Sequence, residues 1–169
     1  MTVPCQVTST GFRALMAGFP TGVAVLTTVD VDDTAWGMTC SSVCSVSVDP
    51  PTLLVCIREG SPTLGAMLRR GYFTVNLLHH GAQATAELFS SGDPDRFDQV
   101  VWEQPLGRGG PHLVRDAHAV ADCRVSRRPE RIGTHLVVFG EVEQITHRSG
   151  EHPLLYGMRQ YAAWPLVHS

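Results

Sequence analysis

The chain has 169 residues, 43% of them apolar, and a formal net charge of −3 at pH 7. That length suffices for one compact domain over residues 1–169, and an acidic balance argues against a nucleic-acid partner, because phosphate contacts need a basic surface. No apolar run approaches the ~20 residues that cross a bilayer, and MTVPCQVTSTG lacks the features of a signal peptide, so we expect a cytoplasmic protein with no membrane partner.

The first predicted element is a helix from about Gly11 to Gly18, which Ser9 or Thr10 can cap. Gly18 and Pro20 end it. Its apolar residues fall on one side at helical spacing and are Phe12, Leu15, Met16 and Phe19.

A β-rich segment follows. GVAVLTTV from Gly22 ends in the polar turn DVDDT and pairs with a second strand from about Ala35, which we expect to run on to the break at Asp49-Pro50-Pro51. TLLVCI is then a short buried strand. The second strand is rich in Ser, Thr and Cys, which pack poorly in a core, so it is either a solvated strand or lies against something polar.

The five cysteines contain no CxxC pair; they are Cys5, Cys40, Cys44, Cys56 and Cys123. Even spacing predicts that Cys40 and Cys44 share one face of the strand. We interpret the five as small, reduced residues in or near the core, and we expect no metal site.

In the second half of the chain, predicted helices and strands continue to follow one another. Ser61-Pro62-Thr63 opens a helix that Gly71 closes, YFTVNLL is a strand, and a helix runs from about Gln83 to Ser90. The segment from Gly92 to Val114 is mainly loop, and HAVADCRV and HLVVFGEVEQI are strands, the second with Gly140 as a bulge or close-approach point. The pattern predicts an antiparallel sheet of about six strands that closes into a small barrel with helices outside.

Any nucleotide must be held without the common phosphate loops, because neither GxGxxG nor GxxxxGK[ST] occurs. The helix that starts at Ser61 leaves N–H groups unpaired, and Ser61, Thr63 and the upstream Arg58 add hydroxyls and a cation, which suits a phosphate. Plain N-capping also explains Ser61. Thr39, Ser41 and Ser42 can serve a flat polar heterocycle, although a solvated strand face explains them equally.

Together these segments resemble the short-chain flavin reductases of two-component monooxygenase systems. The resemblance runs from about Phe12 to Tyr161 and rests on PTGVAVLTT, GMTCSSVCSVSVDPPTLLVCI, GSPT, YFTVNLL, DRF, GGPHLV, ADCRV, GTHLVVFGEV and PLLY. It implies an antiparallel Greek-key split β-barrel, mainly β with peripheral helices, that binds FMN or FAD and uses NADH or NADPH. It further implies a homodimer and a partner, a flavin-dependent monooxygenase that receives reduced flavin.

The resemblance also implies roles for individual residues. The isoalloxazine and ribityl chain would be lined by Gly37, Met38, Thr39, Cys40, Ser41 and Ser42, and the ring would be bordered by Cys56, Ile57 and Arg58. Ser61 and Thr63 would hold the flavin phosphate. Phe89, Arg96 and Phe97 would lie near the flavin tail or the dimer partner, and Tyr156 and Arg159 would face the cofactor cleft.

The implied catalytic residue is His135, on the nicotinamide side. The chain has Gly133-Thr134-His135 where many members have Gly-Asp-His, so the acid that would partner this histidine is missing.

The expected reaction is hydride transfer from NADH to flavin, for which the protein aligns two rings and needs no acid–base pair. Two alternatives stay open: a flavoprotein with tightly bound FMN or FAD that acts directly on an organic substrate, and a non-catalytic flavin-binding module.

Overall fold

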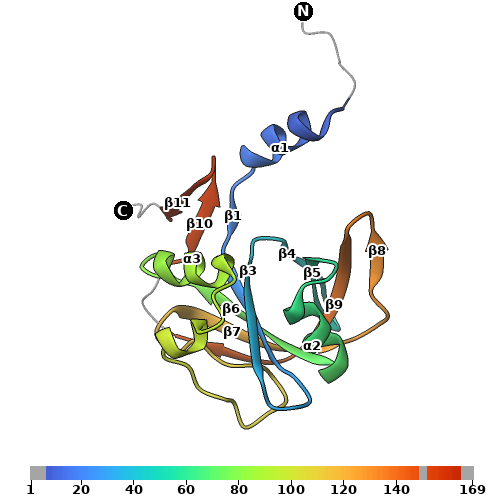
Figure 1. Ribbon diagram of the computed structural model, residues 1–169, viewed down its shortest axis with the longest axis vertical. Coiled ribbons are helices and arrows are strands. Elements are labelled where there is room, and N and C mark those ends of the chain that lie inside the picture. The colour runs from blue at the N-terminus through green and yellow to red at the C-terminus, as the bar shows by residue number, and fades with distance from the viewer. Residues whose placement is uncertain (1–6, 149–151, 165–169) are drawn as a thin grey trace, which may run out of the picture.

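The computed structural model describes residues 7–148 and 152–164 and is built mainly from antiparallel strands (Figure 1). The helices are α1 (Ser9–Ala17), α2 (Pro62–Arg70), α3 (Gln83–Ser91) and a 3-10 turn (Arg96–Gln99). The strands are β1 (Thr21–Gly22), β2 (Ala24–Val29), β3 (Ala35–Cys40), β4 (Val43–Val48), β5 (Pro51–Arg58), β6 (Tyr72–Leu78), β7 (Ala117–Val125), β8 (Glu130–Ile132), β9 (His135–His147), β10 (Leu154–Gly157) and β11 (Gln160–Ala163). Among the described residues, no helix is both long and apolar enough to cross a membrane.

The main sheet has the order β3-β2-β6-β7-β9-β5-β4, with β8 paired to β9. Its two ends, β3 and β4, are consecutive in the chain and joined only by Ser41 and Ser42. Cys56 N donates to Ser42 O at 3.2 Å, which ties this junction to β5. The sheet therefore curls until its first and last strands meet, as a split barrel requires. We call Ser41 and Ser42 the seam.

The seam corrects one sequence prediction. The expected single strand from Ala35 to Asp49 is two strands at opposite ends of the sheet, because the chain bends at the seam. For the same reason Cys40 and Cys44 do not share a face: Cys40 is buried and Cys44 is exposed. Cys5 lies outside the described residues.

The barrel interior is packed by side chains from both halves of the sheet, closed at one side by Leu64 and Met67 of α2. Gly140 lies where β9 passes over Phe73, and a Cβ there would be 2.5 Å from the Phe73 ring, which confirms the predicted close approach. A second core cluster, around Phe89 of α3 and Leu113, covers the other face. Both predicted helix closures are observed, and Gly71 ends α2 in the left-handed conformation with φ 76°.

A loop crosses the outside of β2, β6 and β7 and is held by what we call the glycine-loop network, the side chains of Thr27, Thr74, Asn76, His112 and Asp122. Thr27 and Asn76 donate to Pro111 O at 2.6 and 3.2 Å, and Asn76 accepts from Leu113 N at 2.9 Å. His112 Nε2 lies 2.9 Å from Asp122 Oδ1. Gly110 N donates to Thr74 Oγ1 at 2.7 Å. The predicted loop is thus a fixed structure.

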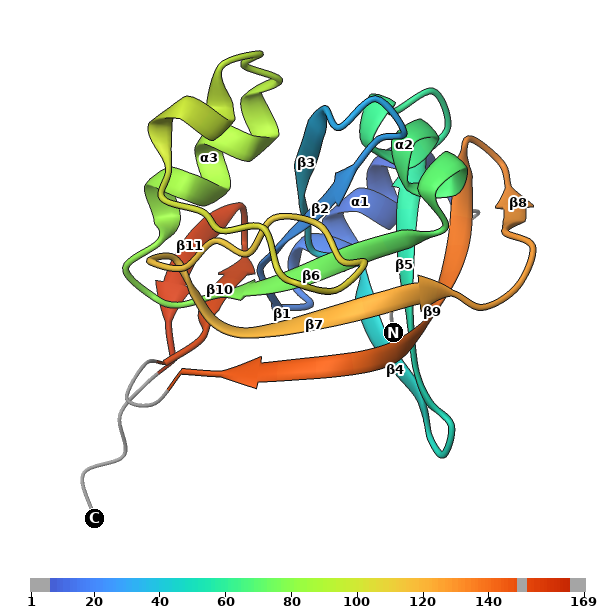
Figure 2. The same ribbon diagram turned by 90° about the horizontal axis from the view of Figure 1, so that it is seen from below.

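Helix α1, which confirms the first predicted helix, and the small sheet β1-β10-β11 form an outlying part (Figure 1). No residue of α1 is buried, so its one-sided apolar stripe does not pack into a core. The hairpin β10–β11 and the short β8 were not predicted. In Figure 2 the β4–β5 hairpin projects from the body of the barrel.

Candidate functional site

Two cavities follow one another along the chain from Trp36 to Cys44. The first, the tail cavity, has a volume of about 340 Å³ and lies between β3, the start of α2 and the end of α3. It brings together seven predicted site residues, Gly37, Met38, Thr39, Ser61, Thr63, Phe89 and Arg96. Because these come from four separate segments, their convergence depends on the fold.

The start of α2 faces the tail cavity with groups that the protein leaves uncommitted. Ser61 is the N-cap residue, but its hydroxyl makes no capping hydrogen bond and its polar contact is Met38 Sδ at 3.5 Å. Pro62 occupies the first helical position. The first-turn N–H groups carry the positive end of the helix dipole, and Arg96 adds a formal charge nearby. The arrangement suits an anionic group.

One wall of this cavity rests on an aromatic pair. Phe89 and Phe97 meet edge-to-face with ring centroids 5.2 Å apart, and Phe89 is 1% exposed. A Cβ on Gly37 would lie 2.7 Å from the Phe89 ring and 3.1 Å from that of Phe97. Glycine is therefore needed at 37 so that β3 can approach the pair. Phe89 supports the wall and has almost no surface for a ligand.

The hydroxyl groups of β3 and the seam have two different roles. Thr39 Oγ1 donates to Ala86 O of α3 at 2.6 Å, so it fastens β3 to the helix. Ser41 and Ser42 are exposed at the seam and line the second cavity. This resolves the question raised by the Ser/Thr-rich stretch: part of it is structural, and part of it faces an open space.

The second cavity, the seam cavity, has a volume of about 670 Å³. Its walls are α1, the seam, β5 and the turn between β10 and β11. It brings together Ser41, Ser42, Cys56, Tyr156 and Arg159 of the predicted set. Tyr156 packs on Tyr161, with ring centroids 5.0 Å apart. The cavity combines short polar side chains on its floor with flat apolar surface on its walls.

Two cysteines near the seam, Cys40 and Cys56, are neutral thiols. Burial raises the pKa of Cys40 to about 11. Burial, with a smaller contribution from Cys44, also raises the pKa of Cys56. Cys56 is therefore a small uncharged wall of the seam cavity.

Five predicted residues lie outside both cavities. Cys40 and Ile57 point into the barrel core and can contribute only backbone groups to a ligand. Phe97 packs behind the tail cavity. Arg58 and His135 are exposed and face each other across β5 and β9. His135 Nδ1 lies 3.1 Å from Thr134 Oγ1, so the hydroxyl of Thr134, the residue that replaces the missing acid, partners the ring.

Sequence reasoning missed several lining residues. Trp36, Ser90 and Gly92 complete the tail cavity, and Phe12, Arg13 and Met16 form the α1 wall of the seam cavity. The available signal was the amphipathic pattern of α1, but amphipathicity alone does not tell whether a helix covers a core or a cavity.

The chain matches the model of the "Flavin reductase like domain" over residues 16–165. It is 51% identical to "Flavin reductase (NADPH)" of Lentzea aerocolonigenes, over 94% of this chain and 92% of that protein. It is 36% identical to the reductase subunit HsaB of a flavin-dependent monooxygenase of Rhodococcus jostii, over 89% and 75% of the two chains. It superposes with a TM-score of 0.87 on the NADH:FAD oxidoreductase SgcE6 of Streptomyces globisporus in complex with NAD and FAD fragments, at 27% identity over 95% and 94% of the chains.

Proposed function

Because the chain belongs to the family of flavin reductase like domains, we propose that it binds its flavin along the stretch from Trp36 to Cys44, with the phosphate in the tail cavity and the ring system at the seam cavity. The chain is an NAD(P)H-dependent flavin reductase, an oxidoreductase that supplies reduced flavin to a monooxygenase. We further propose that it acts as one cytoplasmic domain over residues 1–169.

The observation that carries the proposal is that the uncommitted start of α2 and the hydroxyl-rich seam border the same stretch of chain, from Trp36 to Cys44. The Ser61 hydroxyl is left out of capping and lies beside Thr63 and Arg96. These groups fit a phosphate monoester. The short side chains at Ser41 and Ser42 fit a flat ring that carries hydrogen-bonding atoms on its edge.

The bound flavin supplies the hydride acceptor, and the protein supplies binding, orientation and a water-poor surface. The α2 N-terminus and Arg96 fix one end of the ligand. The seam and the half-buried Cys56 offer donors and close approach, while the exposed ring of Tyr156 supplies apolar cover. A surface that would hold both reactants together would raise their effective concentration.

The phosphate assignment is tested with Ser61→Ala combined with Thr63→Val. We expect the FMN dissociation constant, measured by fluorescence titration, to rise about tenfold, because charge-assisted hydrogen bonds to phosphate are lost. Riboflavin, which lacks the phosphate, should bind unchanged. Ser47→Ala is the control, since that hydroxyl donates to Asp49 O away from the cavity. Equal losses for FMN and riboflavin would remove the assignment.

His135 is the proposed contact on the nicotinamide side. His135→Ala should lower NADH turnover while FMN titration stays intact, since the side chain lines neither cavity. Loss of flavin binding instead would show that the residue is misplaced. A purified protein that is yellow and indifferent to NADH would favour the alternative of a flavin-binding module.

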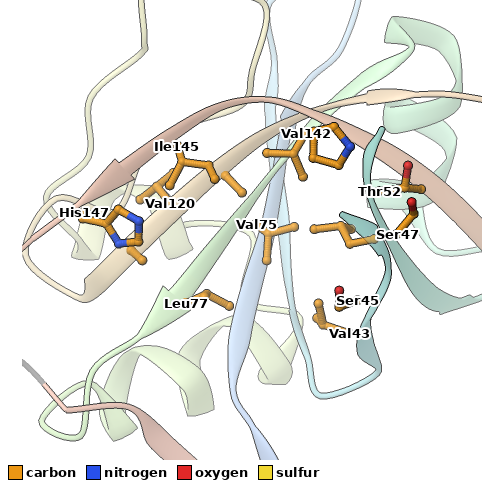
Figure 3. Close-up of a pocket in the computed structure, with 14 residues that line it drawn as sticks. Val43, Ser45, Ser47, Thr52, Val75, Leu77, Val120, Val142, Ile145 and His147 are labelled. Carbon is orange, nitrogen blue, oxygen red and sulfur yellow. The ribbon is translucent and has the colours of Figure 1, made fainter. Parts of the chain in front are cut away.

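We propose a homodimer through the open side of the barrel. An apolar groove of about 330 Å³ lies there between β4 and the strands β7 and β9. Figure 3 shows Val43, Val75 and Val142 around this space. The occupant we propose is a second copy, because the projecting β4–β5 hairpin presents Val48, 90% exposed, to solvent. Val48→Asp should yield a monomer by light scattering, and an unchanged mass would refute this interface.

A further inference from the structure

We propose that Arg13 of α1 and Arg159 of the β10–β11 turn form a clamp for a phosphate of the pyridine nucleotide. The inference rests on the proposed flavin reductase function and adds a site for its second substrate. It concerns the outer rim of the seam cavity, which both arginines line.

The charged side chains that line the seam cavity are all positive. Arg13 and Arg159 are exposed, and within the described part of the chain neither makes an ion pair or a side-chain hydrogen bond. Arg69, Arg124 and Arg131, by contrast, each bind a carboxylate. The described residues that line the seam cavity include no acid. Two guanidinium groups without counter-charge at one cavity match the double negative charge of a phosphate or diphosphate group.

The turn that carries Arg159 is held in an unfavourable conformation. Met158 and Arg159 have φ of 51° and 61°, and Gly157 pairs with Gln160, which defines a two-residue hairpin loop. Such loops with two positive φ values strongly prefer Asn-Gly or Asp-Gly. Backbone strain of this kind persists where the surroundings enforce it, and it gathers at ligand sites.

The enforcing contacts come from α1. Met158 N donates to Ala17 O at the end of the helix, at 2.6 Å. Pro20 lies against Gly157, where an added Cβ would approach Pro20 to 3.1 Å. The strained turn is therefore fastened to the helix that carries Arg13. This link keeps the two arginines on one cavity.

The neighbours of the arginines indicate the class of ligand. Phe12, Met16 and Phe19 lie on the same wall and remain exposed. A ligand that combines flat rings with phosphates matches this wall, and the second substrate of the reaction is such a molecule. The clamp can hold its diphosphate or, in NADPH, its terminal 2′-phosphate.

The test is isothermal titration calorimetry of NADP⁺ and NAD⁺ into the FMN-loaded protein and its Arg13→Ala, Arg159→Ala and double variants. We expect each single change to weaken NADP⁺ binding about tenfold, and to weaken it more than FMN binding. Arg128→Ala, which removes a positive charge outside the cavity, is the control. Weakening confined to NADP⁺ assigns the clamp to the 2′-phosphate, and equal weakening of both nucleotides assigns it to the diphosphate.

Two results would overturn the clamp: unchanged affinity for both nucleotides in the double variant, or a loss that falls on FMN alone. Either can occur in a protein that still reduces flavin, so failure of the clamp is distinguishable from failure of the proposed function. Arg159→Gly adds an independent readout. Glycine relieves the positive φ, so Tm should rise by about 3 °C while NADP⁺ binding weakens. A fall in both Tm and affinity would instead indicate a structural role for Arg159.

Discussion

The glycine-loop network and the seam region are both rich in short polar side chains, but they use them in opposite ways. In the network, Thr27 and Asn76 are buried and bonded to the backbone of the crossing loop. At the seam, Ser41 and Ser42 are exposed, and the nearby Ser61 hydroxyl makes no capping bond. Hydroxyls bonded to the protein hold the fold together. Hydroxyls left open at a cavity are available to a ligand.

The largest expected effect on stability comes from adding a methyl group at Gly110, where the crossing loop lies against β2. Gly110→Ala places a Cβ against the Thr27 backbone, which cannot move without breaking β2. We expect the free energy of unfolding to fall by about 4 kcal/mol in urea titrations. Gly22→Ala is the matched control, because nothing lies within 4 Å of its added Cβ. A Gly110 variant as stable as the control would show that the loop is not tightly held.

The next effect tests the charge inside the network. Asp122→Ala leaves His112 and the Thr74 hydroxyl without the acceptor they share. We expect a loss of about 3 kcal/mol in stability. The FMN dissociation constant should stay within about twofold, because Asp122 lines neither cavity. Asp98→Ala, on the exposed 3-10 turn, serves as control. A large change in FMN affinity would contradict the separation between the glycine-loop network, which stabilises the fold, and the seam region, which binds the ligand.

A smaller effect separates two hydroxyls beside the same cavity. Thr39→Val removes the bond to Ala86 O and should lower stability by about 1 kcal/mol. Ser61→Ala should change stability by less than about 0.5 kcal/mol, since its hydroxyl caps nothing. Thermal unfolding of the ligand-free protein compares them. If the two variants lose equal stability, the lack of a capping hydrogen bond at Ser61 does not mark its hydroxyl as a ligand group.

The smallest effect concerns the paired carboxylate at the β2–β3 turn. Arg69 donates to Asp30 at 3.0 Å, and this hydrogen bond, followed by that from Val31 N, lowers the pKa of Asp30. A lowered folded-state pKa contributes stability above the unfolded value of about 4, and that stability is lost as the pH falls through the folded value. Asp30→Asn should therefore be less stable than wild type at pH 7, and the gap should narrow below pH 4. A pH-independent gap would exclude titration of Asp30 as the cause.

The sequence predicted the local elements well where local chemistry decides them. Gly71 follows a capped helix pattern, and its left-handed conformation is what the pattern requires. The strand YFTVNLL is observed as Tyr72–Leu78. The close approach at Gly140 also followed from a glycine inside a long strand.

The features that escaped prediction depend on distant contacts. The break at Ser41 and Ser42 contains neither Gly nor Pro, and it exists because the barrel curls until its edges meet. The β10–β11 turn at Met158 and Arg159 lacks the usual hairpin residues, and contacts from the end of α1 hold it. Of the candidate site, seven tail cavity residues were foreseen through the family resemblance, whereas Trp36, Ser90 and Gly92 of the same cavity and the α1 wall of the seam cavity were not.

A ligand at the junction between β3 and β4 is expected to strengthen the closure of the barrel. A molecule held at Ser41 and Ser42 lies beside the outermost strand on each side of the sheet, so it links the two sheet edges. Its binding free energy then opposes unrolling of the whole wall. Amide hydrogens of β3 and β4 should consequently exchange more slowly when the ligand is bound, and both strands should be protected to the same extent.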